Sequence, residues 1–463
     1  MQLQKTRRAL LRIPLPLFLC AAGFLGQHGS CAQTPTQPPA PVPLKLSQAI
    51  DLALRQNRSL QLARLAVADS VHKREIARSA YFPHIKNESG LLHVTELAGV
   101  EIPTGAFGVP AATGALPANN LFIGQGSDTT YTSGTGLAQP LTQMFKIHEA
   151  NRAAAADVDT AKIQVNQAED EITLEVRQLY YGLLIGKLRL QAASAEVIAS
   201  QVKSKESADA VAQGRALIVT ALESRATLLD AQQASLTEEL QIHDLTLALD
   251  DLLGLPLNSQ LELDEDASAV SIAIPSREEC LRIAQEQSPE IRAAQQAVIK
   301  ARAGLAAARD AYIPDVTGLA RYSYQSGVPL LVHNFGTFGF TLSYDLFDGG
   351  RRNAEVGDSR TLLSEAELSA AKAKDELTVQ VETAYDKVEQ FESMVGVAKE
   401  LLGVRTEAAR LADRQFEQSA ALASAPEEAH AKAASAKAAL LEATLGLSLA
   451  QAELKRTIGQ IPQ

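Results

Sequence analysis

The 463-residue sequence predicts a mainly α-helical fold that also carries a membrane β-barrel. Three observations predict this fold. The chain contains the same order of segments twice, aromatic residues gather in short alternating strands, and a strand runs directly into a very long helix. The segment FGFTLSYDLFDGGRRNAE (338–355) shows the last feature. Its first residues alternate with a period of two, and helical spacing without proline follows Gly349 and Gly350.

Residues 1–32 have the pattern of an export signal. Basic residues precede the apolar run 13–25, and Ser30 and Ala32 place small side chains at positions −3 and −1 of a cleavage site after Ala32. The apolar run is about 13 residues long, which is short of the roughly 20 that a membrane-spanning helix needs. We therefore expect a signal peptide rather than a single-span anchor. A lipoprotein signal that ends at Cys31 stays open.

Net charge and the lengths of the apolar runs disfavour a nucleic-acid-binding protein and a protein with several membrane-spanning helices. The formal net charge is −11, and it becomes more negative when the four basic residues of the signal are removed, which opposes nucleic acid as a partner. No later apolar run approaches the length of a membrane-spanning helix, so strands would have to make any further membrane crossing. Beyond the signal, Cys280 is the only cysteine, and its place in a helical apolar pattern predicts a core residue.

The chain is an internal duplication with one insertion. Tyr81 aligns with Tyr312 at an offset of 231 (312 − 81), and Gly254 aligns with Gly459 at an offset of 205 (459 − 254). The difference places an insertion at 99–126, which we expect to be an exposed loop. The predicted division is a signal peptide (1–32), a Pro-rich leader (33–43), a first repeat (44–254), a linker (255–275) and a second repeat (276–460).

Each repeat has the same predicted order of helix, strand, strand, long helix and helix. The expected ranges are 46–80, 83–96, 129–142, 143–212 and 216–253 in the first copy, and 276–311, 314–325, 335–347, 352–417 and 421–458 in the second. The two shorter helices of a copy together match the length of the long one, so we expect them to stack end to end along it. Apolar residues in 377–402 step by four and three, which predicts a coiled-coil seam.

Aromatic residues concentrate in the strand regions 81–145 and 312–347. Alternating strands with aromatic side chains are typical of a lipid-facing barrel wall, and a soluble sheet that buries its aromatic residues is the alternative. Four strands cannot close a barrel, and lipid does not tolerate open strand edges. Several chains would therefore have to share one barrel.

The sequence resembles the TolC-type outer-membrane efflux protein family, also called outer membrane factors. The resemblance covers the whole mature chain and is carried by SQAIDLALRQNRSL, by the strand entries RSAYFPHI and RDAYIPDV, and above all by YDLFDGGRRNAE. It implies a homotrimer in which four strands per chain form a twelve-stranded barrel in outer-membrane lipid. A long α-helical tunnel would continue this barrel into the periplasm.

The function that the resemblance implies is passive conduction. The duct would receive substrate from a periplasmic adaptor (membrane fusion protein) and an inner-membrane transporter, in a tripartite efflux or type I secretion system. The alternatives are a periplasmic adaptor or a coiled-coil scaffold protein. An enzyme is disfavoured, because the eight histidines are scattered and no nucleophile elbow or phosphate loop is present. We expect no cofactor and no metal, and the sequence does not indicate the substrate.

The resemblance also assigns roles to individual residues. Gly349 and Gly350 would form the barrel-to-tunnel junction, where we expect a side chain to obstruct the bend. The first copy has PLTQMFKIHEAN at this place, so the two junctions should differ.

In the family, a glycine marks the break between the paired helices, and acidic residues follow near the tunnel entrance. Gly214 keeps that glycine position, whereas the second copy has Ser419. Glu223 and Glu428 lie nine residues further on and are the candidate periplasmic gate, although both could be solvated outer-face residues. Pro426 is expected to disturb the helix near Glu428.

Overall fold

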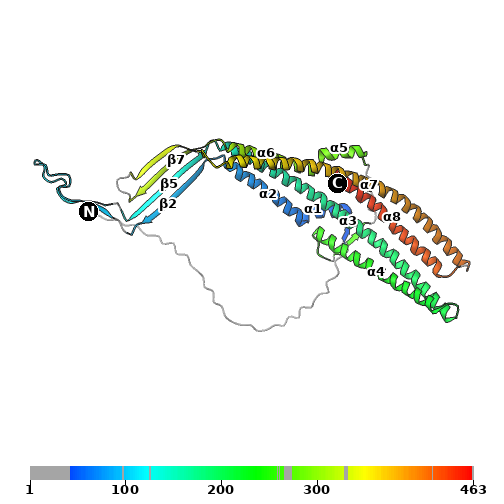
Figure 1. Ribbon diagram of the computed structural model, residues 1–463. Helices are drawn as coiled ribbons and strands as arrows, with labels where there is room; N and C mark the ends of the chain where they lie inside the picture. Colours follow the sequence, from blue (N-terminus) through cyan, green and yellow to red (C-terminus); the bar gives the residue numbers. More distant parts are fainter. Residues whose placement is uncertain are drawn as a thin grey trace, which may run out of the picture. The chain divides into compact units, whose positions relative to one another are not determined.

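The computed structural model describes residues 42–95, 98–124, 127–257, 259, 261–264, 274–327, 332–419 and 421–460. The predicted signal peptide (1–32) and the leader up to residue 41 lie outside the described residues. The predicted order of elements is confirmed in both copies (Figure 1). In the first copy the elements are α1 (Leu46–Gln56), α2 (Arg58–Ser79), β2 (His84–His93), β5 (Thr129–Pro140), α3 (Met144–Ala212) and α4 (Ile218–Leu253). In the second copy they are α5 (Arg277–Gln287), α6 (Pro289–Asp310), β7 (Asp315–Ser326), β8 (Asn334–Ser343), α7 (Arg351–Glu417) and α8 (Ser424–Thr457).

The expectation of one unbroken first helix in each copy was wrong. The break falls at Asn57 in the first copy and at the equivalent Ser288 in the second, and both residues have extended ψ angles. The Asn57 side chain accepts hydrogen bonds from the backbone N–H groups of Ser59 and Leu60, at 2.9 and 3.2 Å. Ser288 accepts from Glu290 at 3.2 Å. Both residues therefore cap a new helix, as Asn and Ser often do.

The strands agree with the expectation except at their ends. β8 ends at Ser343, four residues before the predicted boundary, so Tyr344 and Leu346 lie beyond the paired strand. The insertion at 99–126 is not a plain loop, because β3 (Gly99–Ile102) and β4 (Leu121–Gly124) pair in an antiparallel hairpin within it. These residues are largely exposed, as expected.

Four strands form one antiparallel sheet in the order β2-β5-β7-β8. Side chains alternate between its two faces. Every lysine, arginine, aspartate and glutamate of the four strands lies on one face, and the other face carries all of their tyrosines and phenylalanines except Phe335. The exposed apolar side chains of this second face are Ile85, Leu91, Tyr131, Leu137, Tyr322, Tyr324, Phe338, Phe340 and Leu342. The sheet therefore has one polar and one apolar face, although neither is packed against a core.

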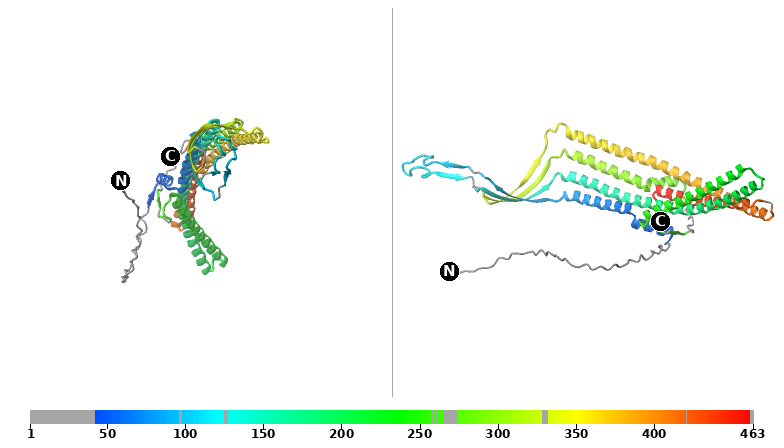
Figure 2. Two further views of the ribbon diagram at one scale, coloured as in Figure 1. Left: turned by 90° about the vertical axis from the view of Figure 1, so that its left-hand side faces the viewer. Right: turned by 90° about the horizontal axis from the view of Figure 1, so that it is seen from below.

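The helices pack side by side in the order α2-α3-α6-α7, and α4 and α8 extend this layer against α3 and α7 (Figure 2). The predicted end-to-end stacking is confirmed. Gly254 at the end of α4 lies against Gln56 at the end of α1, and Gly459 after α8 lies against Gln287 at the end of α5. The long helices α3 and α7 thus have neighbours along their whole length, which explains their many alanines, since small side chains allow close approach.

Two apolar clusters hold the helices together. The predicted seam in α7 is buried at Leu377, Val381, Ala384 and Val388, where it packs against α5 and α8. Cys280 belongs to this cluster and is fully buried, as predicted.

The second cluster surrounds Tyr180 of α3. The Tyr180 hydroxyl lies 3.0 Å from the carbonyl of Leu44 and 3.2 Å from that of Asp264. Leu44 ends β1 (Val42–Leu44) and Asp264 follows β6 (Leu261–Leu263), and these two strands form a parallel pair that the sequence had not indicated. The end of the leader and the linker between the repeats are therefore joined over the middle of α3.

Among the described residues, no helix is both long and apolar enough to cross a membrane.

One carboxylate is buried between α3, α6 and α8. Asp170 is 8% exposed, and its Oδ1 has no hydrogen-bond partner within the described residues. Burial raises the pKa of Asp170 to about 6, although Arg456 opposes the shift; Glu169 and Glu290 add to it. The folded pKa lies above the unfolded value, so this group favours the fold most at low pH. Its contribution is lost as the pH rises through about 4 to 6.

We predict that Asp170→Asn stabilises the protein at pH 8, because the buried negative charge is removed. The expected gain in the free energy of unfolding is about 2 kcal/mol. The gain should disappear near pH 4, where Asp170 itself is protonated. Thermal melts followed by circular dichroism in detergent at both pH values would test this. Asp159→Asn, at an exposed position of the same helix, is the matched control. A loss of stability in Asp170→Asn at pH 8 would show that attraction to Arg456 outweighs burial.

Candidate functional site

The junction between β8 and α7 contains the predicted glycine pair. Gly349 and Gly350 have φ angles of 67° and 91°, in the left-handed region that disfavours other residues. The predicted reason for the glycines was wrong, because a Cβ atom added at either position would meet nothing within 4 Å. Backbone conformation, rather than obstruction of the bend, requires glycine here.

Asp348 fixes the start of α7 directly after this turn. Its carboxylate accepts hydrogen bonds from the backbone N–H groups of Gly350 and Arg352, at 3.0 and 3.2 Å. It also accepts from Nε of Arg352 at 2.6 Å. These bonds, led by the Arg352 side chain, lower the pKa of Asp348 to about 2. The first turn of α7 therefore has a charged cap that supplies the partners its free amides need.

Arg352 links this cap to the neighbouring elements. Its guanidinium lies 4.8 Å from the ring centre of Tyr344 and 5.5 Å from that of Tyr312, which precedes β7. It also donates to the carbonyl of Asp345. Its hydrogen bond to Asp348 raises the pKa of Arg352. Sequence reasoning missed this pair, although an acidic residue four positions before an arginine at a helix start was a usable signal.

The first copy makes the same transition differently, as expected. Gln143 before α3 has ordinary helical angles, without a left-handed residue. Thr142 Oγ1 donates to the carbonyl of Pro314 at 2.7 Å and accepts from the N–H of Val316 at 2.8 Å. Lys146 forms an ion pair with Asp315 at 3.2 Å. The junction of the first copy is therefore fastened to the strand entry of the second.

The helix breaks at the other end of the long helices are equivalent in conformation. Gly214 has a φ angle of 69°, and Ser419 has a φ angle of 57° although it is not a glycine. The expected disturbance at Pro426 was wrong. Pro426 occupies the first turn of α8, where a backbone N–H has no partner within the helix to lose. Glu428 consequently lies in a regular helix.

The two gate candidates have different surroundings. Glu223 is exposed on α4. Glu428 is half-buried and forms an ion pair with Lys203 of α3, at 2.7 Å. One turn along α3, Glu206 accepts the backbone N–H of Ser424 at 3.1 Å. The start of α8 is thus held on the first copy by two charged residues of α3 that no sequence spacing revealed.

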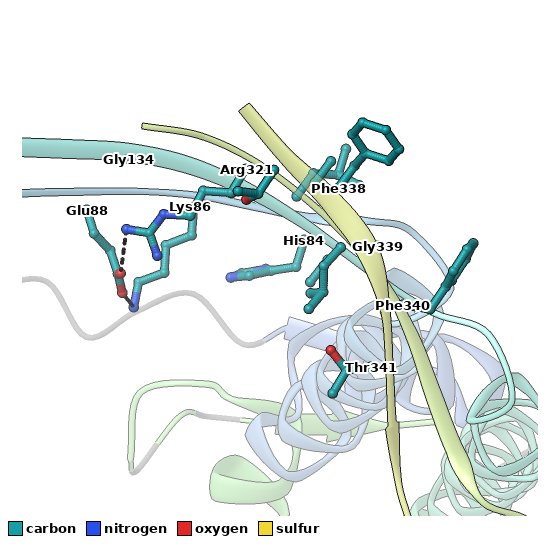
Figure 3. A pocket seen from close by; sticks show the side chains of 15 residues that line it. His84, Lys86, Glu88, Gly134, Arg321, Phe338, Gly339, Phe340 and Thr341 are labelled. Carbon is teal, nitrogen blue, oxygen red and sulfur yellow. Dashed lines mark ion pairs between the residues drawn. The ribbon is translucent and has the colours of Figure 1, made fainter. Parts of the chain in front are cut away.

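The polar face of the sheet is hollowed. The hollow has a volume of about 480 Å³. His84, Lys86, Glu88 and Arg321 project into it, while Phe338 and Phe340 point away from it (Figure 3). Among the residues that the structure describes, no three metal-ligating side chains come together.

A family model described as "Outer membrane efflux protein" matches residues 49–255 and 280–460, which is most of the chain. The chain belongs to the outer membrane efflux protein family. Three solved structures illustrate the shared fold. The Campylobacter jejuni CmeC outer membrane channel is 15% identical, with a TM-score of 0.71 and coverage of 89% of this chain and 85% of CmeC. The Neisseria gonorrhoeae MtrE outer membrane channel in its open state is 18% identical, with a TM-score of 0.68 and coverage of 90% and 89%.

The third, a membrane protein from Pseudomonas aeruginosa, is 18% identical, with a TM-score of 0.70 and 90% coverage of both chains. No curated protein sequence matches this efflux protein significantly. Family membership confirms the predicted fold class, in which the four strands are the chain's share of a barrel and the helices its share of a tunnel. The efflux protein is an outer-membrane duct with its helical tunnel in the periplasm, and this function is favoured over that of an adaptor or scaffold.

We predict that Arg352→Gln lowers the thermal stability of the efflux protein and that Arg351→Gln does not. Arg352 is 11% exposed and joins Asp348 to two tyrosines, whereas the Arg351 side chain is 59% exposed and makes only surface ion pairs. Thermal unfolding in detergent should occur at a temperature several degrees lower for Arg352→Gln. The folded pKa of Asp348 is depressed, so the Asp348 interaction is present above about pH 4 and is lost as the pH falls through about 2. Equal melting temperatures for both variants would contradict the assigned role.

Proposed function

We propose that three copies of this chain close one barrel and one tunnel. The observation that carries the proposal is the pair of open strand edges. Within the described residues, β2 pairs only with β5 and β8 only with β7. Unpaired backbone groups are costly in lipid, so the free edge of β8 pairs with the free edge of β2 in the next copy. Such a head-to-tail contact makes a ring when its rotation closes, and three copies supply twelve strands.

The helix layer supports the same assembly. Its order α2-α3-α6-α7 follows the strand order, so α2 and α7 continue the two open edges of the sheet, and α4 flanks α3 on the side away from α8. These edge helices carry apolar side chains that the single chain leaves more than half exposed: Leu62, Leu65, Ile76, Leu222, Leu229, Leu236, Leu240, Leu362, Leu368, Val379, Val397 and Val404. Burial of these residues between copies would stabilise the ring in the periplasm, where strand pairing is absent.

The proposed duct is passive and has no catalytic role. It receives its substrate from a periplasmic adaptor and an inner-membrane transporter, as the family resemblance implies. The proposed mature chain follows a signal peptide of residues 1–32 and consists of the leader 33–43, the repeats 44–254 and 276–460, and the linker 255–275. The matched segments of the family model and the equivalent helix breaks of the two copies support this division.

We further propose that Glu223 and Glu428 form the acidic periplasmic gate. Their support is their equal distance from the two left-handed breaks at Gly214 and Ser419. Three copies place six carboxylates near the mouth, where acidic side chains favour cations at a constriction. Because Lys203 neutralises Glu428 within the chain, Glu223 carries the larger share of the local potential.

The proposed assembly predicts a stoichiometry. Light scattering in mild detergent should give three times the mass of the mature chain. Val397→Asp places a charge at a proposed interface position of α7 and should reduce the trimer fraction strongly, because burial of an unpaired charge is costly. Val109→Asp, at an equally exposed position in the insertion, should leave the trimer intact. A monomer as the stable species of the unaltered protein would refute the assembly.

The proposed gate predicts a change in ion selectivity. Glu223→Gln should lower the cation selectivity of the trimer in planar bilayers more than Glu428→Gln does. Lys203→Gln should raise it, because this change releases the charge of Glu428. Unchanged selectivity in all three variants, with trimers intact, would assign both glutamates to the solvated outer face.

A further inference from the structure

Two cationic side chains lie in one row of paired residues across the barrel sheet. Such a row is called a rung below. Lys86 of β2 pairs with Gly136 of β5, Gly136 pairs with Arg321 of β7, and Arg321 pairs with Thr337 of β8. One glycine therefore separates the two cationic residues across three neighbouring strands. Since residues on one rung project from the same face, both side chains enter the hollow on the polar face (Figure 3).

The Arg321 guanidinium lies directly over the backbone of β5. Gly134 is the next residue after Gly136 on the same face, and a Cβ atom at Gly134 would lie 2.5 Å from Nη2 of Arg321. The glycine therefore leaves the space that the guanidinium occupies here, and a larger residue at this position would make the Arg321 side chain move.

Glu88 only partly neutralises the positive charges of Lys86 and Arg321. It forms an ion pair with Lys86 at 2.7 Å and a longer one with Arg321 at 3.9 Å. The other charged residue of the four strands is Asp315, which is paired with Lys146 at the junction. Each chain therefore contributes one net positive charge at this rung, and the Arg321 side chain is 52% exposed and lines the hollow.

Phe338 and Phe340 point away from the hollow and are 92% and 79% exposed in the single chain. An apolar aromatic face meets lipid, so the opposite, charged face lines the lumen of the closed barrel. Three copies then place six cations and three glutamates around one level of the lumen. Low-dielectric walls concentrate this positive potential where solutes pass.

We propose that Lys86 and Arg321 form an anion-binding collar in the barrel lumen that recognises carboxylate and phosphate groups of anionic solutes. The inference rests on the proposed trimeric duct, and it adds a binding site of opposite sign to the acidic gate. Arg321 supplies a planar fork of donors that fits two oxygens of such a group, and Lys86 supplies a point charge. Glu88 holds Lys86 in place and limits the affinity, so that a bound anion can leave, as conduction requires.

The test uses the full-length trimer in planar bilayers with inorganic tripolyphosphate added on the barrel side. In the unaltered protein the polyanion should block the current. In the double variant Lys86→Gln/Arg321→Gln the concentration for half block should rise about tenfold or more, because charge-assisted hydrogen bonds are lost. Glu88→Gln should change the block in the opposite direction and strengthen it. Lys162→Gln, on α3 outside the barrel, is the matched control for the loss of a cation.

The outcomes separate the collar from the duct. Each variant is first shown to be trimeric by light scattering. Trimers of the double variant and of Glu88→Gln that conduct with unchanged block would overturn the collar and leave the duct standing. If the double variant does not assemble, the Glu88→Gln variant alone decides. The collar requires that tripolyphosphate blocks Glu88→Gln more strongly than the unaltered protein, and any other result overturns the collar. An unaltered protein that forms no conducting trimer would overturn the duct and with it the collar.

Discussion

Much of this structure depends on the two unpaired edges of a four-stranded sheet. β2 and β8 each present a row of backbone N–H and C=O groups that no part of the described chain pairs, and lipid offers these groups no hydrogen bonds. The proposed trimer follows from this constraint, because a single chain in lipid would leave both edges unpaired. The same constraint orders the helices, because each strand is joined to the helix that continues it, and the open edges of the sheet extend into the helix layer as exposed apolar stripes. It also sorts the two faces of the sheet, since a closed barrel gives one face to lipid and the other to water.

The junction between strand and long helix occurs once in each repeat, and different contacts hold it in the two repeats. In the second copy, two left-handed glycines turn the chain, and Asp348 and Arg352 fix the helix that follows. In the first copy there is no such turn, and Thr142 and Lys146 bond to Pro314 and Asp315 in the other repeat. The two repeats thus form their junctions differently. The junction of the second repeat is held by its own residues, whereas the junction of the first repeat is held by residues of the second.

Charged side chains of this protein differ in how far they are buried, and their burial determines whether they can bind solutes. Asp170 lies among helices without a hydrogen-bond partner for its Oδ1 among the described residues, and its pKa is raised to about 6. Lys203 and Glu428 lie near the helix breaks, and their ion pair holds the start of α8 on α3. Lys86 and Arg321 lie in an open hollow of the sheet, where water and solutes reach them. The low dielectric of a packed interior penalises a charge, whereas a lumen leaves the same charge available for binding.

The sequence by itself determined the duplication, the order of strands and long helices, the apolar seam of α7 and the core position of Cys280, because hydrophobic periodicity and repeat spacing are local signals. Even the helix breaks at Asn57 and Ser288 were present as capping residues, although the longer periodic pattern masked them. Tertiary structure alone decided which distant residues meet. Lys203 meets Glu428, Tyr180 binds the strand pair of leader and linker, and Lys86 shares a rung with Arg321 across a glycine. These contacts depend on the register between elements far apart in the chain, which no local pattern encodes.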